Sequence, residues 1–176
     1  MSATSATVLF VYGTRPEAVK LAPVVTAVQA TPGLRAVVAV TGQHRAMLDQ
    51  VNEIFGIVPD HDLDLAAPRQ TLAHITTRAL DGVGAVIERE QPAMVVVQGD
   101  TTTAFASALA AFYAQVPVAH VEAGLRTGDR YSPFPEELNR RLVGQLASLH
   151  LAPTTTTRDN LLAEPVDPAS IIVTGN

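Results

Sequence analysis

The chain has 176 residues, enough for one domain with a sizeable core, and 47% of them are hydrophobic against 16% charged, as in ordinary globular proteins. Its net charge of -5 gives no support for binding to nucleic acid or to a membrane surface, and the absence of cysteine excludes disulfides and fits a cytoplasmic protein. No run of about eighteen apolar residues is present, so we expect no transmembrane helix. The first segment, MSATSATVLF, has no basic residue before its short apolar run, so we expect no secretory signal peptide.

Short Val-rich runs alternate with amphipathic stretches along the chain, a pattern typical of βαβ units around a parallel sheet buried on both faces. We therefore predict an α/β fold, a three-layer αβα Rossmann-like domain over residues 1–176 with a mostly parallel sheet. The predicted strands are Val8–Tyr12, Ala36–Thr41, Met94–Gln98, Val118–Val121, His150–Ala152 and Ile171–Val173. The predicted helices are Glu17–Ala30, Arg45–Phe55, Thr71–Glu90, Thr102–Ala114, Pro135–Ala147 and Thr155–Glu164.

Several local signals refine these elements. Thr14 and Glu17 form a capping box at the start of the first helix, and Gly56 is placed to end the second. Pro23 is expected to kink or divide the first helix. The connection Ile57–Arg69 contains the strictly alternating segment DHDLDL, which indicates a short additional strand.

The chain ends in IIVTGN, a strand followed by Gly-Asn, where another βα turn is expected to begin. A doubly wound sheet rarely stops at such a turn. We therefore expect a C-terminal half that this chain lacks.

Ligands of open α/β sheets bind beyond the carboxyl ends of the strands, so the polar residues that follow each strand are candidate site residues. The first such segment is GTRPEAVK. Gly13 allows close backbone approach, while Arg15 and Lys20, the only lysine in the chain, are suited to an anionic ligand at a helix N-terminus. A capped helix carrying two solvated cations explains the same residues equally well.

Two further strands are followed by polar groups. Gln43 and His44 follow the second predicted strand, although His44 also suits a helix cap. Asp100 follows the Met94–Gln98 strand, where it can either cap the next helix or present a carboxylate to the cleft for proton transfer.

The segment HVEAGLRTGDRYSPFPEELNR is the richest in candidates. Glu122 directly follows a buried strand, where burial would favour acid–base chemistry, although pairing with Arg126 is a structural alternative. Glu136 and Glu137 begin a helix, where carboxylates also favour the helix dipole. Asp100, Glu122 and Glu136 together form a candidate acid–base set.

The remaining histidines carry weaker signals. His61, His74 and His150 lie in a loop, on a helix face and in a short strand, whereas His120 alternates onto the same side of its strand as Glu122. No HxxxH or cysteine-bearing metal pattern is present, so we predict no required metal.

The chain resembles the N-terminal domain of bacterial non-hydrolysing UDP-N-acetylglucosamine 2-epimerases. The resemblance runs from about Val8 to Asn176 and rests on FVYGTRPEAVKLAP, TGQHRAMLDQV, QGDTTTAFASALAAFY, HVEAGLRTGDRYSPFPEELNR and VTGN. It implies a two-domain protein of the GT-B type, whose active site lies between two Rossmann-like domains. This chain is expected to supply the first domain only, and the nucleotide-binding C-terminal domain is expected to be missing.

The family reaction interconverts UDP-GlcNAc and UDP-ManNAc by inversion at C2, through anti elimination of UDP to a 2-acetamidoglucal and re-addition. On matching positions, the resemblance implies that Arg15 and Lys20 bind the nucleotide sugar. Asp100, Glu122 and Glu136 are implied to be the catalytic carboxylates, with Asp100 and Glu122 also contacting the substrate. No cofactor is implied. Without the second domain, we expect the chain alone to be inactive.

Many bacterial members also bind a second UDP-GlcNAc as an allosteric activator, and Gln43, Arg69 and Glu136 match positions used for it. One departure is Ala46, where the family often has Gln, so an effector contact is expected to be missing. A homodimer is implied for the full-length protein. The alternatives are a non-catalytic domain that binds a sugar nucleotide or a partner, a hydrolysing UDP-GlcNAc 2-epimerase, and a GT-B glycosyltransferase.

Overall fold

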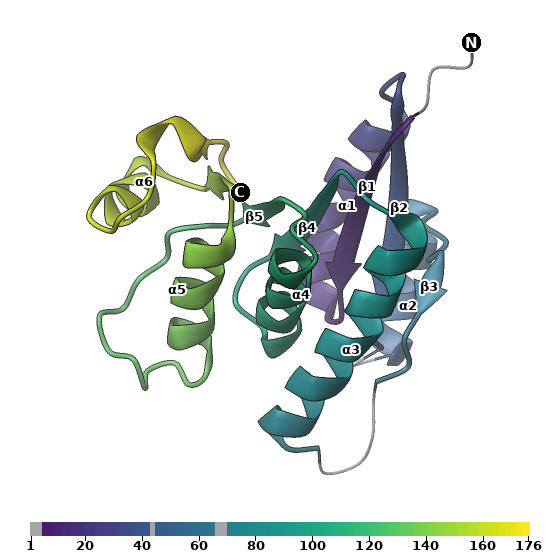
Figure 1. Cartoon of the computed structure of the whole chain (residues 1–176), viewed down its shortest axis with the longest axis horizontal. Coiled ribbons are helices and arrows are strands. Elements are labelled where there is room, and N and C mark those ends of the chain that lie inside the picture. Colours follow the sequence, from purple (N-terminus) through teal and green to yellow (C-terminus); the bar gives the residue numbers. More distant parts are fainter. Residues whose placement is uncertain (1–4, 43–44, 66–69) are drawn as a thin grey trace.

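The structure, a computed structural model, describes residues 5–42, 45–65 and 70–176, without the side chains of residues 45 and 46. Within these ranges, seven parallel strands form one sheet in the order β3-β2-β1-β4-β5-β6-β7 (Figure 1). The strands are β1 (Ala6–Tyr12), β2 (Leu34–Val40), β3 (His61–Asp62), β4 (Met94–Gln98), β5 (Val118–Val121), β6 (Leu149–Ala152) and β7 (Ile171–Val173). The α-helices are α1 (Arg15–Gln29), α2 (Arg45–Phe55), α3 (Leu72–Glu90), α4 (Thr102–Tyr113), α5 (Glu136–Leu146) and α6 (Thr155–Leu162), with a 3-10 turn at Pro168–Ser170.

The sheet is buried on both faces, as the Val-rich runs predict. In β1, Leu9 and Val11 enter the core beneath α3, α4 and α5, while Phe10 and Tyr12 enter the core beneath α1 and α2. All four side chains are fully buried, which explains why this strand is apolar at consecutive positions rather than at alternate ones. The three-layer αβα prediction is confirmed.

The strand order reverses direction between β1 and β4, which lie side by side in the centre of the sheet. Chain segments that follow β1 run toward β2 and β3, and those that follow β4 run toward β5, β6 and β7. Ligands of doubly wound sheets bind at this switch point, outside the carboxyl ends of the strands. A ligand site is therefore expected at the loops after β1, β4 and β5.

Most local signals in the sequence are confirmed. The alternating DHDLDL segment contains β3, which pairs with the end of β2. Gly56 has a φ of 65°, and the N–H of Ile57 bonds the carbonyl of Asn52 at 2.8 Å, so the predicted glycine stop closes α2.

Pro23 does not divide the first helix, which was one of the two effects predicted for it. α1 runs unbroken from Arg15 to Gln29. Proline removes one backbone hydrogen bond, but Leu21, Ala22 and Val25 on both sides of it are at most 1% exposed in the core against the sheet. Packing of this apolar face holds the helix together across the proline.

Within the described ranges, none of the helices combines the length and the apolar character that crossing a bilayer requires.

Candidate functional site

The loops after β1, β4 and β5 are set close together by two glycines. A Cβ atom on Gly13 would lie 2.1 Å from Oγ1 of Thr41, so only glycine fits between the ends of β1 and β2. Gly99 follows β4 with a φ of 68°, and a Cβ there would lie 3.5 Å from Oε2 of Glu122. The backbone of the β4–α4 loop thus passes directly beside the Glu122 carboxylate.

Glu122 is held as a paired carboxylate at the end of β5. Lys20 of α1 donates to Oε1 of Glu122, and the side-chain amide of Gln98 donates to Oε2. The Glu122 side chain is only 14% exposed. Its backbone has a φ of 66°, a left-handed conformation that costs energy for any residue except glycine and is found preferentially at functional sites.

The proposed alternative partner of Glu122 is wrong. The Arg126 guanidinium instead makes two parallel hydrogen bonds, of 2.7 and 2.8 Å, to the carboxylate of Glu164 just after α6. The Glu122 charge is therefore compensated inside the cleft by Lys20 rather than by the neighbouring loop.

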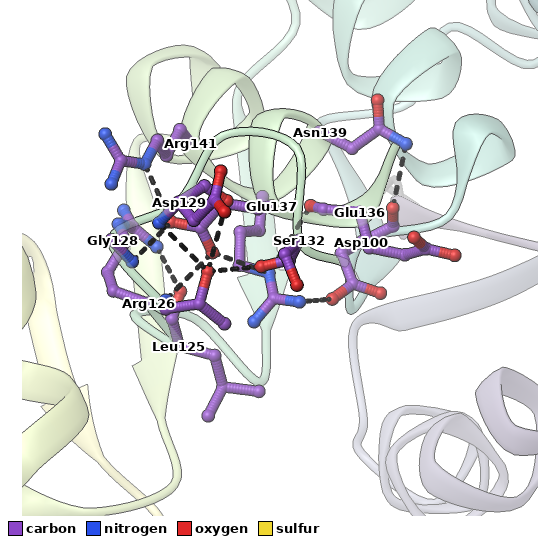
Figure 2. A network of polar contacts seen from close by, with 12 residues as sticks. Asp100, Leu125, Arg126, Gly128, Asp129, Ser132, Glu136, Glu137, Asn139 and Arg141 are labelled. Carbon is purple, nitrogen blue, oxygen red and sulfur yellow. Dashed lines mark hydrogen bonds and ion pairs between the residues drawn. The ribbon is translucent and has the colours of Figure 1, made fainter. Parts of the chain in front are cut away.

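Asp100 faces the same region from the end of β4. Its Oδ2 lies 2.9 Å from Nη2 of Arg140, and the side-chain amide of Asn139 donates to its backbone carbonyl at 2.9 Å (Figure 2). Burial raises the pKa of Asp100 above its usual range, although the positive charge of Arg140 acts in the opposite direction. A raised pKa makes a carboxylate a stronger base than an ordinary aspartate, which favours proton transfer.

Asp100 does not cap α4, contrary to one of the two interpretations of the sequence. The cap is Thr101, whose Oγ1 accepts a hydrogen bond of 3.0 Å from the N–H of Ala104. The Asp100 carboxylate is thus not needed to begin the helix and is free for another role.

Glu136 completes the predicted carboxylate set. It is the first residue of α5 and is half-buried. The charges of Glu136 and Glu122 both act to raise the pKa of Asp100, so both carboxylates lie within electrostatic range of Asp100. The cations Lys20 and Arg140 lie among them and oppose that pKa shift.

The loop between β5 and α5 is anchored by Glu137, which the sequence suggested favours the helix dipole. This side chain is fully buried. It accepts a bond of 3.0 Å from the N–H of Thr127 and one of 2.9 Å from Arg141, in the network that Figure 2 shows around the loop. Burial acts to raise the pKa of Glu137, but these hydrogen bonds outweigh it and lower the pKa.

Of the remaining residues predicted to bind a ligand, the structure describes Arg15 but not those near the second strand and in the connection before α3. Arg15 occupies the first turn of α1 with an exposed side chain, which forms no hydrogen bond or ion pair with residues that the structure describes. Gln43, His44 and Arg69 lie outside the described residues, so the predicted effector site is represented by Glu136 alone.

His120 does not reach the cleft. Its ring is fully buried, with Nε2 2.7 Å from the carbonyl oxygen of Gly99 and no partner for Nδ1 among the described residues. Burial lowers the pKa of His120 to about 4. No group of three or more potential metal ligands occurs among the residues searched, which are those that the structure describes.

Sequence reasoning missed the residues that hold the carboxylates in place: Gln98, Asn139 and Arg140. A signal was present in α5, where Glu137, Arg140 and Gly144 occupy buried positions at helical spacing. Charged residues at positions where an amphipathic helix normally carries apolar ones indicate a buried polar network.

A pocket of about 410 Å³ opens beside Lys20 and Glu122. Its apolar wall includes Val19, Pro23 and Leu151. The site thus combines carboxylates, cations and an apolar surface at one end of the sheet, a combination suited to a polar ligand that carries both hydroxyl and phosphate groups.

Comparison with known proteins identifies relatives of the chain. The family model described as UDP-N-acetylglucosamine 2-epimerase matches residues 26–176. A putative UDP-N-acetylglucosamine 2-epimerase from Thermotoga maritima is 58% identical over 96% of the chain and 44% of its own length. The UDP-N-acetylglucosamine 2-epimerase of Escherichia coli K12 is 56% identical over 96% of the chain and 45% of its own length. The chain therefore spans less than half the length of these relatives.

Solved structures agree with this comparison. The UDP-GlcNAc 2-epimerase from Neisseria meningitidis, bound to UDP-GlcNAc, superposes with a TM-score of 0.94 at 50% identity, covering 97% of the chain and 46% of that protein. The enzyme from Methanocaldococcus jannaschii, in complex with UDP-GlcNAc and UDP, gives a TM-score of 0.90 at 36% identity, covering 97% and 46%. MurG of Acinetobacter baumannii shares the fold at 13% identity, with a TM-score of 0.66.

Proposed function

Because the chain belongs to the UDP-N-acetylglucosamine 2-epimerase family, we propose that it is the N-terminal half of an enzyme that interconverts UDP-GlcNAc and UDP-ManNAc. The observation that supports this most directly is the convergence of Asp100, Glu122 and Glu136 beside Lys20 at the carboxyl end of the sheet. Inversion at a sugar carbon requires a proton to leave one face and arrive at the other, and a set of carboxyl groups supplies both the base and the acid.

The proposed reaction proceeds by elimination and re-addition. A carboxylate removes the C2 proton while the bond between C1 and the UDP oxygen breaks, leaving a C1–C2 double bond in a 2-acetamidoglucal and free UDP. The UDP oxygen then adds back to C1, and a carboxylic acid delivers a proton to the opposite face of C2. Asp100 is suited to carry a proton because burial raises its pKa.

The departing UDP develops negative charge, which cations can stabilise. Arg15 lies in the first turn of α1 with an exposed side chain, so its guanidinium can reach an anionic group of the ligand. Lys20 lies five residues further along the same helix and becomes available after exchanging its bond to Glu122 for one to the substrate. We therefore assign nucleotide-sugar binding to these two residues.

The same proposal covers the cofactor, the effector, the oligomeric state and the second half of the site. Neither the elimination nor the re-addition transfers a hydride, so the proposed reaction needs no nicotinamide. A second UDP-GlcNAc would act as effector at Gln43, Arg69 and Glu136, and the full-length protein would be a homodimer. The second half of the site would come from the segment that corresponds to the remainder of the relatives, of which the chain covers 44–45%.

Incubation of the full-length protein with UDP-GlcNAc in D₂O tests the proposal. Epimerisation through loss of the C2 proton should place deuterium at C2 in both UDP-GlcNAc and UDP-ManNAc. Release of free ManNAc would indicate a hydrolysing enzyme instead. Binding of UDP-GlcNAc with neither exchange nor turnover would indicate a non-catalytic domain, and each of these two results would refute the proposal.

A further inference from the structure

Glu17 is a buried carboxylate that the proposed chemistry does not use. It lies in the first turn of α1 with 1% of its surface exposed. Its Oε2 accepts hydrogen bonds from the N–H groups of Gly13, at 2.9 Å, and Thr14, at 2.7 Å. Placing an ionised carboxylate in the interior is costly, so a residue that only caps its own helix would be expected near the surface.

The second carboxylate oxygen reaches a different loop. Oε1 of Glu17 accepts a hydrogen bond of 2.7 Å from the hydroxyl of Thr101, which in turn accepts from the N–H of Ala104 and caps α4. One side chain thus joins the loop after β1 to the loop after β4, the two strands that flank the switch point of the sheet. A capping box requires only the bond to Thr14, so helix capping does not explain the bond between Glu17 and Thr101.

The partners of Glu17 are chain neighbours of the proposed site residues. Thr14 directly precedes Arg15, and Thr101 directly follows Asp100. The surroundings leave little room for adjustment, because a Cβ on Gly13 would lie 2.1 Å from Oγ1 of Thr41. Burial raises the pKa of Glu17, and its hydrogen bonds act in the opposite direction.

We propose that Glu17 is a positioning residue, which fixes the β1–α1 and β4–α4 loops relative to each other so that Arg15 and Asp100 address the same nucleotide sugar. This inference rests on the proposed function. Glu17 itself does not contact the substrate; it acts through the two loops. Displacement of reacting groups by about 1 Å is enough to cost about 10²-fold in rate.

The first test is kinetic and uses the full-length protein. Glu17→Gln keeps the shape of the side chain but presents an amide N–H₂ where Thr101 donates. We expect kcat to fall by about 10²-fold while KM for UDP-GlcNAc stays within about threefold. Thr101→Val should have the same effect, whereas Thr101→Ser, which keeps the hydroxyl, should retain the wild-type kcat.

A double substitution distinguishes coupling from two separate defects. If Glu17 acts through Thr101, the variant with both Glu17→Gln and Thr101→Val should be no slower than the slower single variant, within about threefold. The matched control is Glu90→Gln, since Glu90 is also a hydrogen-bonded carboxylate but pairs with Arg35 and His61 away from these loops. This control should keep the wild-type kcat.

A second readout does not depend on activity. Thr101 does not bond Gly13 or Thr14 itself, so a change in their amide hydrogen exchange in Thr101→Val must be transmitted between the two loops, through Glu17 or through the lost cap of α4. We expect exchange of the Thr14 amide to accelerate about tenfold or more in Thr101→Val and to be unchanged in Thr101→Ser. This measurement applies even if Glu17→Gln fails to fold.

The outcomes separate the two proposals. An inactive wild-type protein would overturn the proposed function, and the exchange experiment would still test the coupling of the loops. An active wild-type protein whose Glu17→Gln and Thr101→Val variants keep the wild-type kcat would overturn the positioning role alone. The same holds if the loss of kcat matches the fraction of protein unfolded at the assay temperature, or if Thr14 exchange in Thr101→Val is unchanged.

Discussion

Asp100 is held from two sides by residues of α5, through its carboxylate by Arg140 and through its backbone carbonyl by Asn139. Both contacts fix the carboxylate without using it to begin a helix, since Thr101 caps α4. A side chain that is paired, partly buried and unnecessary for the local fold is a strong candidate for chemistry.

Replacement of this carboxylate by an amide separates chemistry from structure. In the full-length protein, Asp100→Asn should fold normally and lower kcat by about 10²–10⁴-fold, the range typical of lost general acid–base catalysis. Exchange of the C2 proton with D₂O should fall in parallel. Asp159→Asn, at an exposed carboxylate of α6 paired with Arg158, serves as the control and should leave kcat unchanged. Wild-type exchange in Asp100→Asn would remove Asp100 from the proton-transfer step.

The negative charge of Glu122 also has a structural partner in Lys20, so the effect of removing it on catalysis must be separated from its effect on stability. Glu122→Gln should likewise lower kcat by about 10²–10⁴-fold. If the residue served only to neutralise Lys20, the same variant would lose thermal stability and keep its C2 exchange rate.

His120 makes the stability of the protein depend on pH. Burial lowers its pKa to about 4 in the folded state, whereas an unfolded histidine titrates near 6.5. Between these values the unfolded chain binds a proton that the folded protein does not, so acidification favours unfolding. We expect the free energy of unfolding to fall by about 2 kcal/mol between pH 7 and pH 5 from this residue alone.

Urea unfolding at both pH values measures this effect. His120→Gln keeps a donor toward the carbonyl of Gly99 but does not titrate, so it should lose most of the pH dependence. His74→Gln, at an exposed position on α3, should retain it. Equal pH dependence in the His120→Gln variant and the wild-type protein would contradict the prediction.

At the scale of elements, the loop between β5 and α5 depends on one buried carboxylate. The segment between β5 and α5 extends away from the sheet (Figure 1). Glu137 ties it to α5 by accepting hydrogen bonds from the backbone N–H of Thr127 and from the side chain of Arg141. Removing the charge leaves buried N–H groups with a weaker acceptor.

Adjacent glutamates in the first turn of α5 provide a matched pair for testing this anchor. Glu137→Gln should lower the free energy of unfolding by about 2 kcal/mol, whereas Glu136→Gln, at a half-buried position, should change it by less than about 0.5 kcal/mol. Urea denaturation of both variants at pH 7 is the measurement. Equal stability of the two variants would show that the loop is anchored elsewhere.

The elements of this fold could be predicted because their signals are local. β4, β5 and β7 begin and end at the residues that the sequence indicates, and so does α2. Each combines an apolar run of characteristic length with turn residues on either side, and neither feature depends on distant parts of the chain. The two-residue strand β3 was also detectable, through strict alternation.

The partners of the site residues could not be predicted because they depend on tertiary placement. Arg126 and Glu122 are near in sequence, yet Arg126 pairs with Glu164, which is 38 positions away. Asp100 and Arg140 meet because α4 and α5 pack on the same face of the sheet. The carboxylates at strand ends and Lys20 can thus be recognised from the sequence, whereas their pairings and the contributions of Gln98, Asn139 and Arg140 depend on the fold.

At the scale of the whole molecule, we propose that the chain presents one wall of a site. The carboxylates and Lys20 lie at the carboxyl end of the sheet, and Arg15 is exposed at the same end of α1. The relatives are more than twice as long as the part that this chain covers. We propose that the corresponding second segment closes the site over the substrate, in the manner of GT-B proteins.

This arrangement predicts that the 176-residue chain alone does not epimerise UDP-GlcNAc, even when it is folded. One wall leaves the substrate exposed to water, which weakens the electrostatic stabilisation of the departing UDP and leaves the sugar poorly oriented. Chromatographic separation of the two epimers after prolonged incubation should show no UDP-ManNAc above the blank. Adding the C-terminal segment, either in one chain or as a separate folded domain, should restore turnover. Robust conversion by the isolated chain would show that one wall is sufficient and would contradict the two-domain proposal.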